Sequence, residues 1–341
     1  LHLLSRRQRQ MCIRDSMYIE SSFRYKQIQD IINITLQDYY SFVYNPTNNP
    51  LIENLSKRDL LFKIERHGVA NGKYPIINAF SIYKATKDVI IITEKLVEMI
   101  ESIIFNSEPD NNRAACMIDT AISYCAFHEM GHLLLGHCQI QKDMRMCAIE
   151  NTNENTDIAI YQMLEADADT FAAKRLGEKM VTLIFDDRYK SILGYKSIDI
   201  FYEDILKGIN AFFYILMYLE LLEAKESYML TSNGEIPKGR RHNEATHDHP
   251  PAIARCYYTG KTLIEHLYYQ FQIPPKEKYF MEILYSSDYL FGGIELTSMQ
   301  KEKKFNHITD GSFDETFNAM RQEWLLNTCK ILSQYSRIPV F

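Results

Sequence analysis

The sequence predicts an α+β fold that is mainly helical, with a small β-sheet ahead of a series of long helices. Three observations support this prediction. Short segments with strand-like apolar patterns lie close together at 60–66, 75–83 and 89–93. Apolar residues recur at helical spacing through 94–105 and through most of the chain after residue 177. The apolar content of 46% is ordinary for a globular protein with a large core.

The first sixteen residues are set apart from the rest of the chain. The sequence MCIRDS at 11–16 resembles the translation of an adapter used in sequencing libraries. We therefore expect 1–16 to be a non-native scar and Met17 to be the true start. A basic leader is the alternative, although the segment lacks the apolar stretch of a secretory signal. It carries four Arg and one Asp, a net +3, so without it the formal charge changes from −6 to −9.

Composition limits the partners and the compartment. An acidic chain is a poor candidate for non-specific nucleic-acid binding, so we expect no nucleic-acid partner. The seven Cys form no CxxC pair, which is typical of a reducing compartment. The most apolar run, 209–222, is interrupted by Asn210 and Glu220 and is shorter than the ~20 residues of a membrane helix. These features favour a cytoplasmic protein without an integral membrane span, and they leave its oligomeric state open.

The elements follow in order along the chain. A helix at 22–44 and a loop at 45–50 occupy an N-terminal part, 17–58. The core, 59–185, begins with the three strands, and Asn71 with Gly72 predicts a hairpin between the first two. After the helix at 94–105, it contains a long helix carrying residues 117–135, an exposed connector at 150–157 and a helix at 157–176. The last region, 186–341, has four predicted helices: 200–227, 249–271, 277–290 and 313–333.

The sequence HEMGH at 128–132 is an HExxH motif. Four residues turn a helix by about 400°, so His128 and His132 lie on one face and can bind one ion at roughly 2.0–2.1 Å. Glu129 lies at the flank of that face, where it can hold a metal-bound water. A helix that carries two His by chance is the alternative. The apolar surroundings argue against it, because burying these polar groups without a partner would be costly.

Glu165 is the favoured third metal ligand. Asp169 lies four residues further along the same predicted helix, so one carboxylate can bind zinc while the other accepts the spare N–H of a ligand His. A solvated acidic face is one alternative for this pair, and His137 as the ligand is another. If the first helix continued, His137 would lie about 900° from His128, on the opposite face. Three protein ligands leave the fourth position open for water, which predicts one catalytic Zn²⁺ per chain.

The pattern HExxH followed by ExxxD resembles that of the gluzincin zinc metallopeptidases, in particular the group containing HtpX and the CAAX prenyl proteases. Asn78, Ala79 and Phe80 are similar to the group's NAF strand, and His249 with Arg255 to its HP…R element. The resemblance covers roughly 59–177 and a short piece around His249. Those relatives are membrane proteins, whereas this chain has no comparable span. A weaker likeness, limited to the zinc motif, is to the soluble phage-exclusion peptidase Lit.

The resemblance implies a zincin-like core with a small sheet and two metal-bearing helices, completed by residues near 247–255. It implies that Glu165 binds zinc, that Asp169 supports the site, and that His249 and Arg255 lie near the reacting carbonyl. Asn78, Ala79 and Phe80 would then bind a peptide or protein substrate. The expected activity is hydrolysis of peptide bonds, with Glu129 as the general base.

Other interpretations stay open. A narrow-specificity regulatory or phage-defence protease would share this chemistry but act on one cellular protein. A non-catalytic scaffold would use zinc only to hold helices together, although a structural site needs no base such as Glu129. His247 and His249 could form a second metal site, and 231–248 could be a lid or a plain surface loop.

Overall fold

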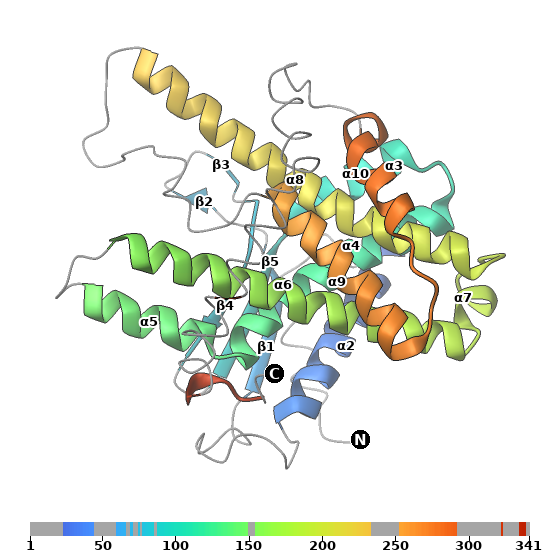
Figure 1. The fold of residues 1–341 in the computed structure, drawn as a ribbon, viewed down its shortest axis with the longest axis horizontal. Helices are drawn as coiled ribbons and strands as arrows, with labels where there is room; N and C mark the ends of the chain where they lie inside the picture. Colours follow the sequence, from blue (N-terminus) through green and yellow to red (C-terminus); the bar gives the residue numbers. More distant parts are fainter. Residues whose placement is uncertain are drawn as a thin grey trace.

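The computed structural model describes residues 23–43, 59–65, 69–70, 74–75, 77–84, 87–148, 154–232, 252–291, 322 and 334–338. Within these ranges the fold is mainly helical with a small sheet, as the sequence predicted (Figure 1). The predictions for the segment 1–16, for the loop beyond residue 232, for His247 and His249, and for a helix at 313–333 fall outside the described residues.

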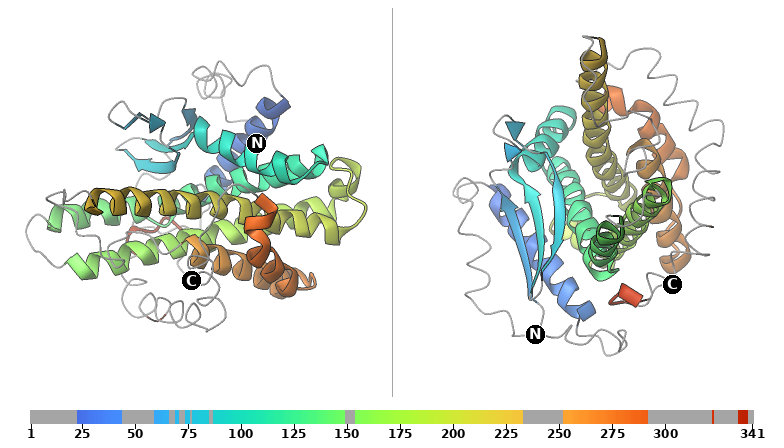
Figure 2. Two further views of the ribbon diagram at one scale, coloured as in Figure 1. Left: turned by 90° about the horizontal axis from the view of Figure 1, so that it is seen from above. Right: turned by 90° about the vertical axis from the view of Figure 1, so that its left-hand side faces the viewer.

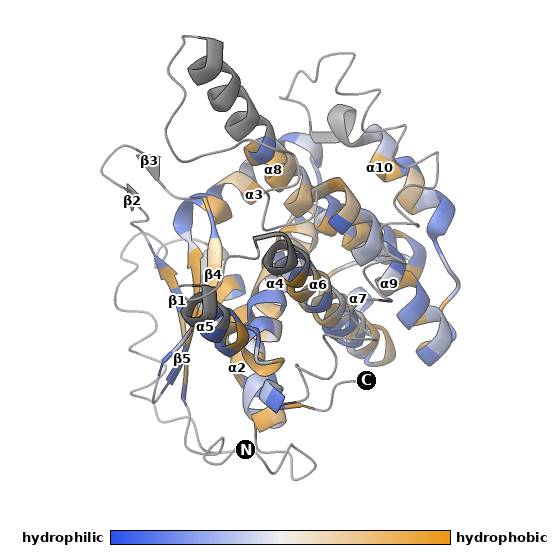
Figure 3. Cartoon of the chain, turned by 60° about the vertical axis from the view of Figure 1, so that its left-hand side comes forward, coloured by the Kyte–Doolittle hydropathy of each residue, from blue (hydrophilic) through white to orange (hydrophobic). Residues whose placement is uncertain are grey.

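The main sheet has three strands: β1 (Asp59–Glu65), β4 (Ala79–Tyr83) and β5 (Lys87–Thr93). Their order is β1-β5-β4, with β1 parallel and β4 antiparallel to β5. All residues of β5 after Lys87 are buried, which suits the central position of a covered sheet. Figure 3 shows hydrophobic residues along these strands.

The predicted hairpin between the first two strands of this sheet is wrong. Asn71 and Gly72 instead lie between β2 (Val69–Ala70) and β3 (Tyr74–Pro75), which form a separate antiparallel pair. The partner of β1 is β5, because β5 has the most apolar sequence and takes the middle of the sheet. All three predicted strands are present, but the burial of β5, and not the turn signal of Asn71 and Gly72, determines which strand pairs with β1.

Helix α4 (Asn111–Leu134) is the central helix of the molecule, and from Cys116 to Leu134 nearly every residue is buried. It packs against the sheet, α2 (Phe23–Val43), α3 (Glu94–Ser107) and two later helices (Figure 2). The side chain of Asp110 caps its N-terminus by accepting hydrogen bonds from the backbone N–H groups of Asn112 and Arg113, at 2.9 and 3.2 Å.

Helices α6 (Glu154–Phe185) and α8 (Ile198–Ser232) cover α4 on the side away from the sheet (Figure 2). The long α6 and α8 pack on α4, and α9 packs on both of them. Gly208 allows the close approach of α8, because a Cβ atom there would lie 2.6 Å from the carbonyl oxygen of Met117. No helix within the described ranges is long and apolar enough to cross a membrane. The described helices after α4 are, in chain order, α5 (His137–Ala148), α6 (Glu154–Phe185), α7 (Arg188–Ser191), α8 (Ile198–Ser232), α9 (Ala252–Phe271) and α10 (Glu277–Phe291).

The helices predicted at 200–227, 249–271 and 277–290 correspond to α8, α9 and α10, with shifted ends. The predicted helix at 157–176 is part of the much longer α6. The expected exposed connector at 150–157 is therefore partly wrong, since its last four residues belong to this helix.

A short segment near the end of the sequence, 334–338, packs against the C-terminal end of α4. The backbone N–H of Arg337 donates a 2.8 Å hydrogen bond to the carbonyl of Leu134. Its guanidinium pairs with the fully buried Asp88 of β5 and donates to the hydroxyl of Tyr39 on α2. Asp88 and Arg337 thus compensate each other's charge, and the segment ties a strand and two helices together.

Candidate metal centre

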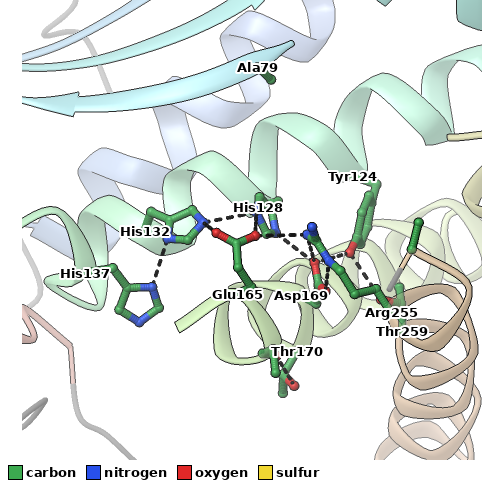
Figure 4. A network of polar contacts seen from close by, with 12 residues as sticks. Ala79, Tyr124, His128, His132, His137, Glu165, Asp169, Thr170, Arg255 and Thr259 are labelled. Carbon is green, nitrogen blue, oxygen red and sulfur yellow. Dashed lines mark hydrogen bonds and ion pairs between the residues drawn. The ribbon is translucent and has the colours of Figure 1, made fainter. Parts of the chain in front are cut away.

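Three donor atoms converge between α4 and α6. The Nε2 atoms of His128 and His132 lie 3.0 Å apart, and each lies 3.3 Å from a carboxylate oxygen of Glu165 (Figure 4). Ligands at 2.0–2.1 Å from a tetrahedral zinc stand about 3.3 Å from one another. All three side chains are buried. The donor types and their spacing therefore fit a zinc ion with three protein ligands.

Packing of α6 on α4 places these donors. His128 and His132 are one turn apart on α4, and Glu165 projects from α6 (Figure 4). Gly131 lies between the helices, where an added Cβ atom would stand 3.1 Å from the side chain of Phe171 and 3.4 Å from the backbone of Ala168. The glycine of the motif thus permits the close approach that brings Glu165 to the two imidazoles.

Asp169 and Arg255 form a charged pair beside His128. An oxygen of Asp169 lies 2.9 Å from His128 Nδ1, the ring nitrogen that faces away from Glu165 and His132. Arg255 donates two 2.8 Å hydrogen bonds to Asp169, and its Nη2 lies 3.2 Å from Glu165. The hydroxyl of Tyr124 donates a further hydrogen bond of 2.7 Å to Asp169. We call the pair of Asp169 and Arg255 the clamp. Through its contacts with His128 and Tyr124 it connects α6 and α9 to α4, beside the three converging donors (Figure 4).

Electrostatics in the clamp favour bound positive charge. Burial would raise the pKa of Asp169, but the charges and hydrogen bonds of Arg255 and His128 together outweigh it and hold that pKa well below its usual range. Burial would also raise the pKa of Glu165, which His132 and Arg255 instead lower strongly. Burial lowers the pKa of His128, but Asp169 and Glu165 together raise it to about 10. Two ionised carboxylates thus face an imidazole that can hold a proton or a metal ion.

His137 lies beside His132 and outside the three converging donors. Helix α4 ends at Leu134, and Gly136 turns the chain with a φ of 79° before α5 begins at His137. The prediction that His137 points to the opposite face assumed a continuous helix, and the structure breaks that helix. A Gly directly before the His is a known helix-ending signal that could have revealed this turn.

Glu129 is buried, with 7% of its surface exposed. Its carboxylate makes no hydrogen bond or ion pair with any residue that the structure describes. The carboxylates of Glu165 and Asp169, in contrast, are both engaged by Arg255. The motif glutamate therefore keeps its proton-accepting oxygens available beside the ligand histidines.

The predicted substrate strand lies along α4. Ala79 and Phe80 belong to β4, an edge strand of the main sheet, and Asn78 directly precedes it. The backbone of Asn78 is held by Thr93, which accepts from its N–H at 3.1 Å and donates to its carbonyl at 3.0 Å. Figure 4 shows Ala79 on the strand that crosses α4, whereas the side chains of His128 and His132 point toward Glu165 of α6. Comparisons of the chain with family models, curated proteins and solved structures gave no match.

Proposed function

We propose that this chain is a zinc-dependent metallopeptidase with a zincin-like core and a gluzincin-type ligand set. The observation that carries the proposal is the zinc-like spacing of the His128, His132 and Glu165 donors, at 3.0, 3.3 and 3.3 Å. The unpaired carboxylate of Glu129 beside them supplies the second requirement, a base.

His128, His132 and Glu165 would hold the ion. Zinc in such a site would supply a Lewis acid that polarises a carbonyl and lowers the pKa of water toward ~7. Glu129 accepts a proton from the attacking water and delivers it to the departing amine. The clamp of Asp169 and Arg255 keeps His128 and Glu165 in place during this proton transfer.

The edge strand β4 supports a peptide as the substrate class. Among the strands that the structure describes, it pairs only with β5, on one side. An extended peptide could add to the other side through backbone hydrogen bonds and lie along α4 close to His128. The backbone of Asn78, Ala79 and Phe80 would set the register of this added strand. A preference for one cellular protein would then depend on side-chain pockets outside the backbone pairing.

Elemental mass spectrometry of the purified full-length chain tests the metal site. We expect about one zinc per chain in the wild type and in Glu129→Gln, and a large loss in Glu165→Ala. Glu178→Gln is a matched control, because this partly exposed residue lies on the same helix as Glu165 and its carboxylate pairs only with Arg175 among the described residues. A wild-type chain without zinc would overturn the proposal.

Cleavage of a proteome-derived peptide mixture tests the chemistry. Glu129→Gln should retain zinc but lose about 10²–10⁴-fold in rate, the usual contribution of a general base. A Glu129→Gln variant as active as the wild type would remove Glu129 from the mechanism. If peptides resist cleavage but one intact cellular protein is cut, the narrow-specificity protease is the correct form of the proposal. Zinc binding without any cleavage would favour the non-catalytic scaffold.

A further inference from the structure

His137 contacts the back of a metal-binding imidazole. Its Nδ1 lies 3.0 Å from Nδ1 of His132, while Nε2 of His132 faces His128 and Glu165 (Figure 4). The other nitrogen of His137, Nε2, lies 3.2 Å from a carboxylate oxygen of Asp167 on α6. His137 is fully buried, so its two ring nitrogens depend on these contacts rather than on solvent.

The positions of the protons follow from the contacts. A His that binds metal through Nε2 carries its proton on Nδ1, so His132 must donate from Nδ1. The Nδ1 of His137 must then accept, because two N–H groups cannot face each other at 3.0 Å. The proton of a neutral His137 therefore sits on Nε2, where the Asp167 carboxylate accepts it. Each contact in the series thus has one donor and one acceptor.

We infer that His137 is a positioning residue that fixes the ring and the tautomer of His132, and that Asp167 in turn fixes His137. This inference rests on the proposed function, since it assumes that His132 binds metal through Nε2. Ligand histidines are usually oriented by a carboxylate or a backbone carbonyl, and loss of that support weakens metal binding by about 10–100-fold. Here the neutral imidazole of His137 orients His132, and the carboxylate of Asp167 contacts His137 rather than His132.

The turn at Gly136 makes this contact possible. Its positive φ of 79° reverses the chain within two residues of the end of α4. A Cβ atom at this position would lie 2.5 Å from the backbone of Tyr335, so a larger residue would push the turn away. His137 is therefore held by the end of α4 and by the 334–338 segment, rather than by a flexible loop.

Zinc affinity, measured by competition with a chromophoric chelator, tests the inference. We expect His137→Leu to weaken zinc binding by about 10–100-fold. His137→Gln should restore most of the affinity, because its amide carbonyl can accept the N–H of His132. Asp167→Asn should have a smaller effect in the same direction. His266→Leu is the control. Within the described part of the chain, the Nε2 of His266 is buried without a hydrogen-bond partner, and the residue lies on α9 away from the metal-binding donors.

The outcomes separate this inference from the proposed function. If the wild type binds no zinc, both fail. If the wild type binds zinc and His137→Leu binds it equally well, only the inference fails. If Leu and Gln weaken binding equally, the role of His137 is packing and the inference also fails. Should His137→Leu not fold, the affinities of His137→Gln and Asp167→Asn decide, and loss of affinity confined to Asp167→Asn supports the inference.

Discussion

The two histidines of α4 that we propose as metal ligands have different surroundings, although they lie one turn apart. His128 is supported by the ionised pair of Asp169 and Arg255, which is buried and makes several hydrogen bonds. His132 is supported by the imidazole of His137, beyond which lies the partly accessible Asp167. We expect the pair of Asp169 and Arg255 to affect both the charge around His128 and the stability of the fold, because three helices meet at this pair. The second support controls orientation, and we expect it to contribute little to the stability of the fold.

The largest expected effect comes from breaking the charged support. Asp169→Ala leaves the guanidinium of Arg255 buried without its bidentate partner, so the free energy of unfolding should fall by about 3–5 kcal/mol. Urea unfolding of the zinc-free chain measures this change. Asp186→Ala, at an exposed position just after α6, should change stability by less than about 0.5 kcal/mol. If Asp169→Ala lowered the free energy of unfolding as little as the control does, the buried charge of Arg255 would not depend on Asp169 for its compensation.

A smaller effect is expected from the hydroxyl that joins the same clamp. Tyr124→Phe removes a hydrogen bond of 2.7 Å to the ionised Asp169 and should cost about 1.5–3 kcal/mol in the same unfolding measurement. Tyr202→Phe is the matched control, because its buried hydroxyl has no hydrogen-bond partner among the residues that the structure describes. We expect the control to be neutral or slightly stabilising. Equal losses for both variants would contradict a special contribution from Tyr124.

The smallest expected effect concerns the rate at which two cysteines are alkylated, and it involves no change in the free energy of unfolding. Cys125 is deeply buried in α4 near His128, and burial raises its pKa well above the usual range. Cys138, near His132, is half-buried, and burial raises its pKa to about 11. Because only the thiolate reacts, alkylation of the folded chain should modify Cys138 before Cys125, about tenfold faster per pH unit between pH 8 and 10. Peptide mapping by mass spectrometry reads both sites.

The reverse order of labelling would contradict the proposed difference between the two surroundings. A Cys138 rate that levels off near pH 9 would show reaction through an opened form with an ordinary thiol pKa. Either result would weaken the view that the folded structure protects the two thiols to different degrees.

Local patterns predicted much of the fold and the close approach of His128 and His132. Helical spacing alone puts these two on one face, and apolar periodicity located most of the helices. The approach of Glu165 was expected from its four-residue spacing to Asp169 on a predicted helix and from the resemblance to a known motif, not from its distance along the chain. The predicted pairing of the first two strands was wrong, because a turn signal says nothing about which strand becomes central.

These local patterns could not predict contacts between segments that are far apart in the sequence. The surroundings of His137 depend on a single backbone angle at Gly136 and on the 334–338 segment, some 200 residues away in sequence. The pairing of Arg337 with Asp88 likewise spans 249 positions, and neither residue stands in a motif. Such contacts are set by tertiary packing, which single-sequence patterns do not describe.

The pairing of Arg337 with Asp88 and Tyr39 also has a consequence for the order of folding. The contact between Arg337 and Tyr39 spans 298 positions, so the ribosome must have passed residue 337 before it can form. Until then the carboxylate of Asp88 lacks its cation, and the end of α4 lacks the backbone donor of Arg337. We therefore expect the helix that carries the HExxH motif to become fully stable only after the 334–338 segment has been made.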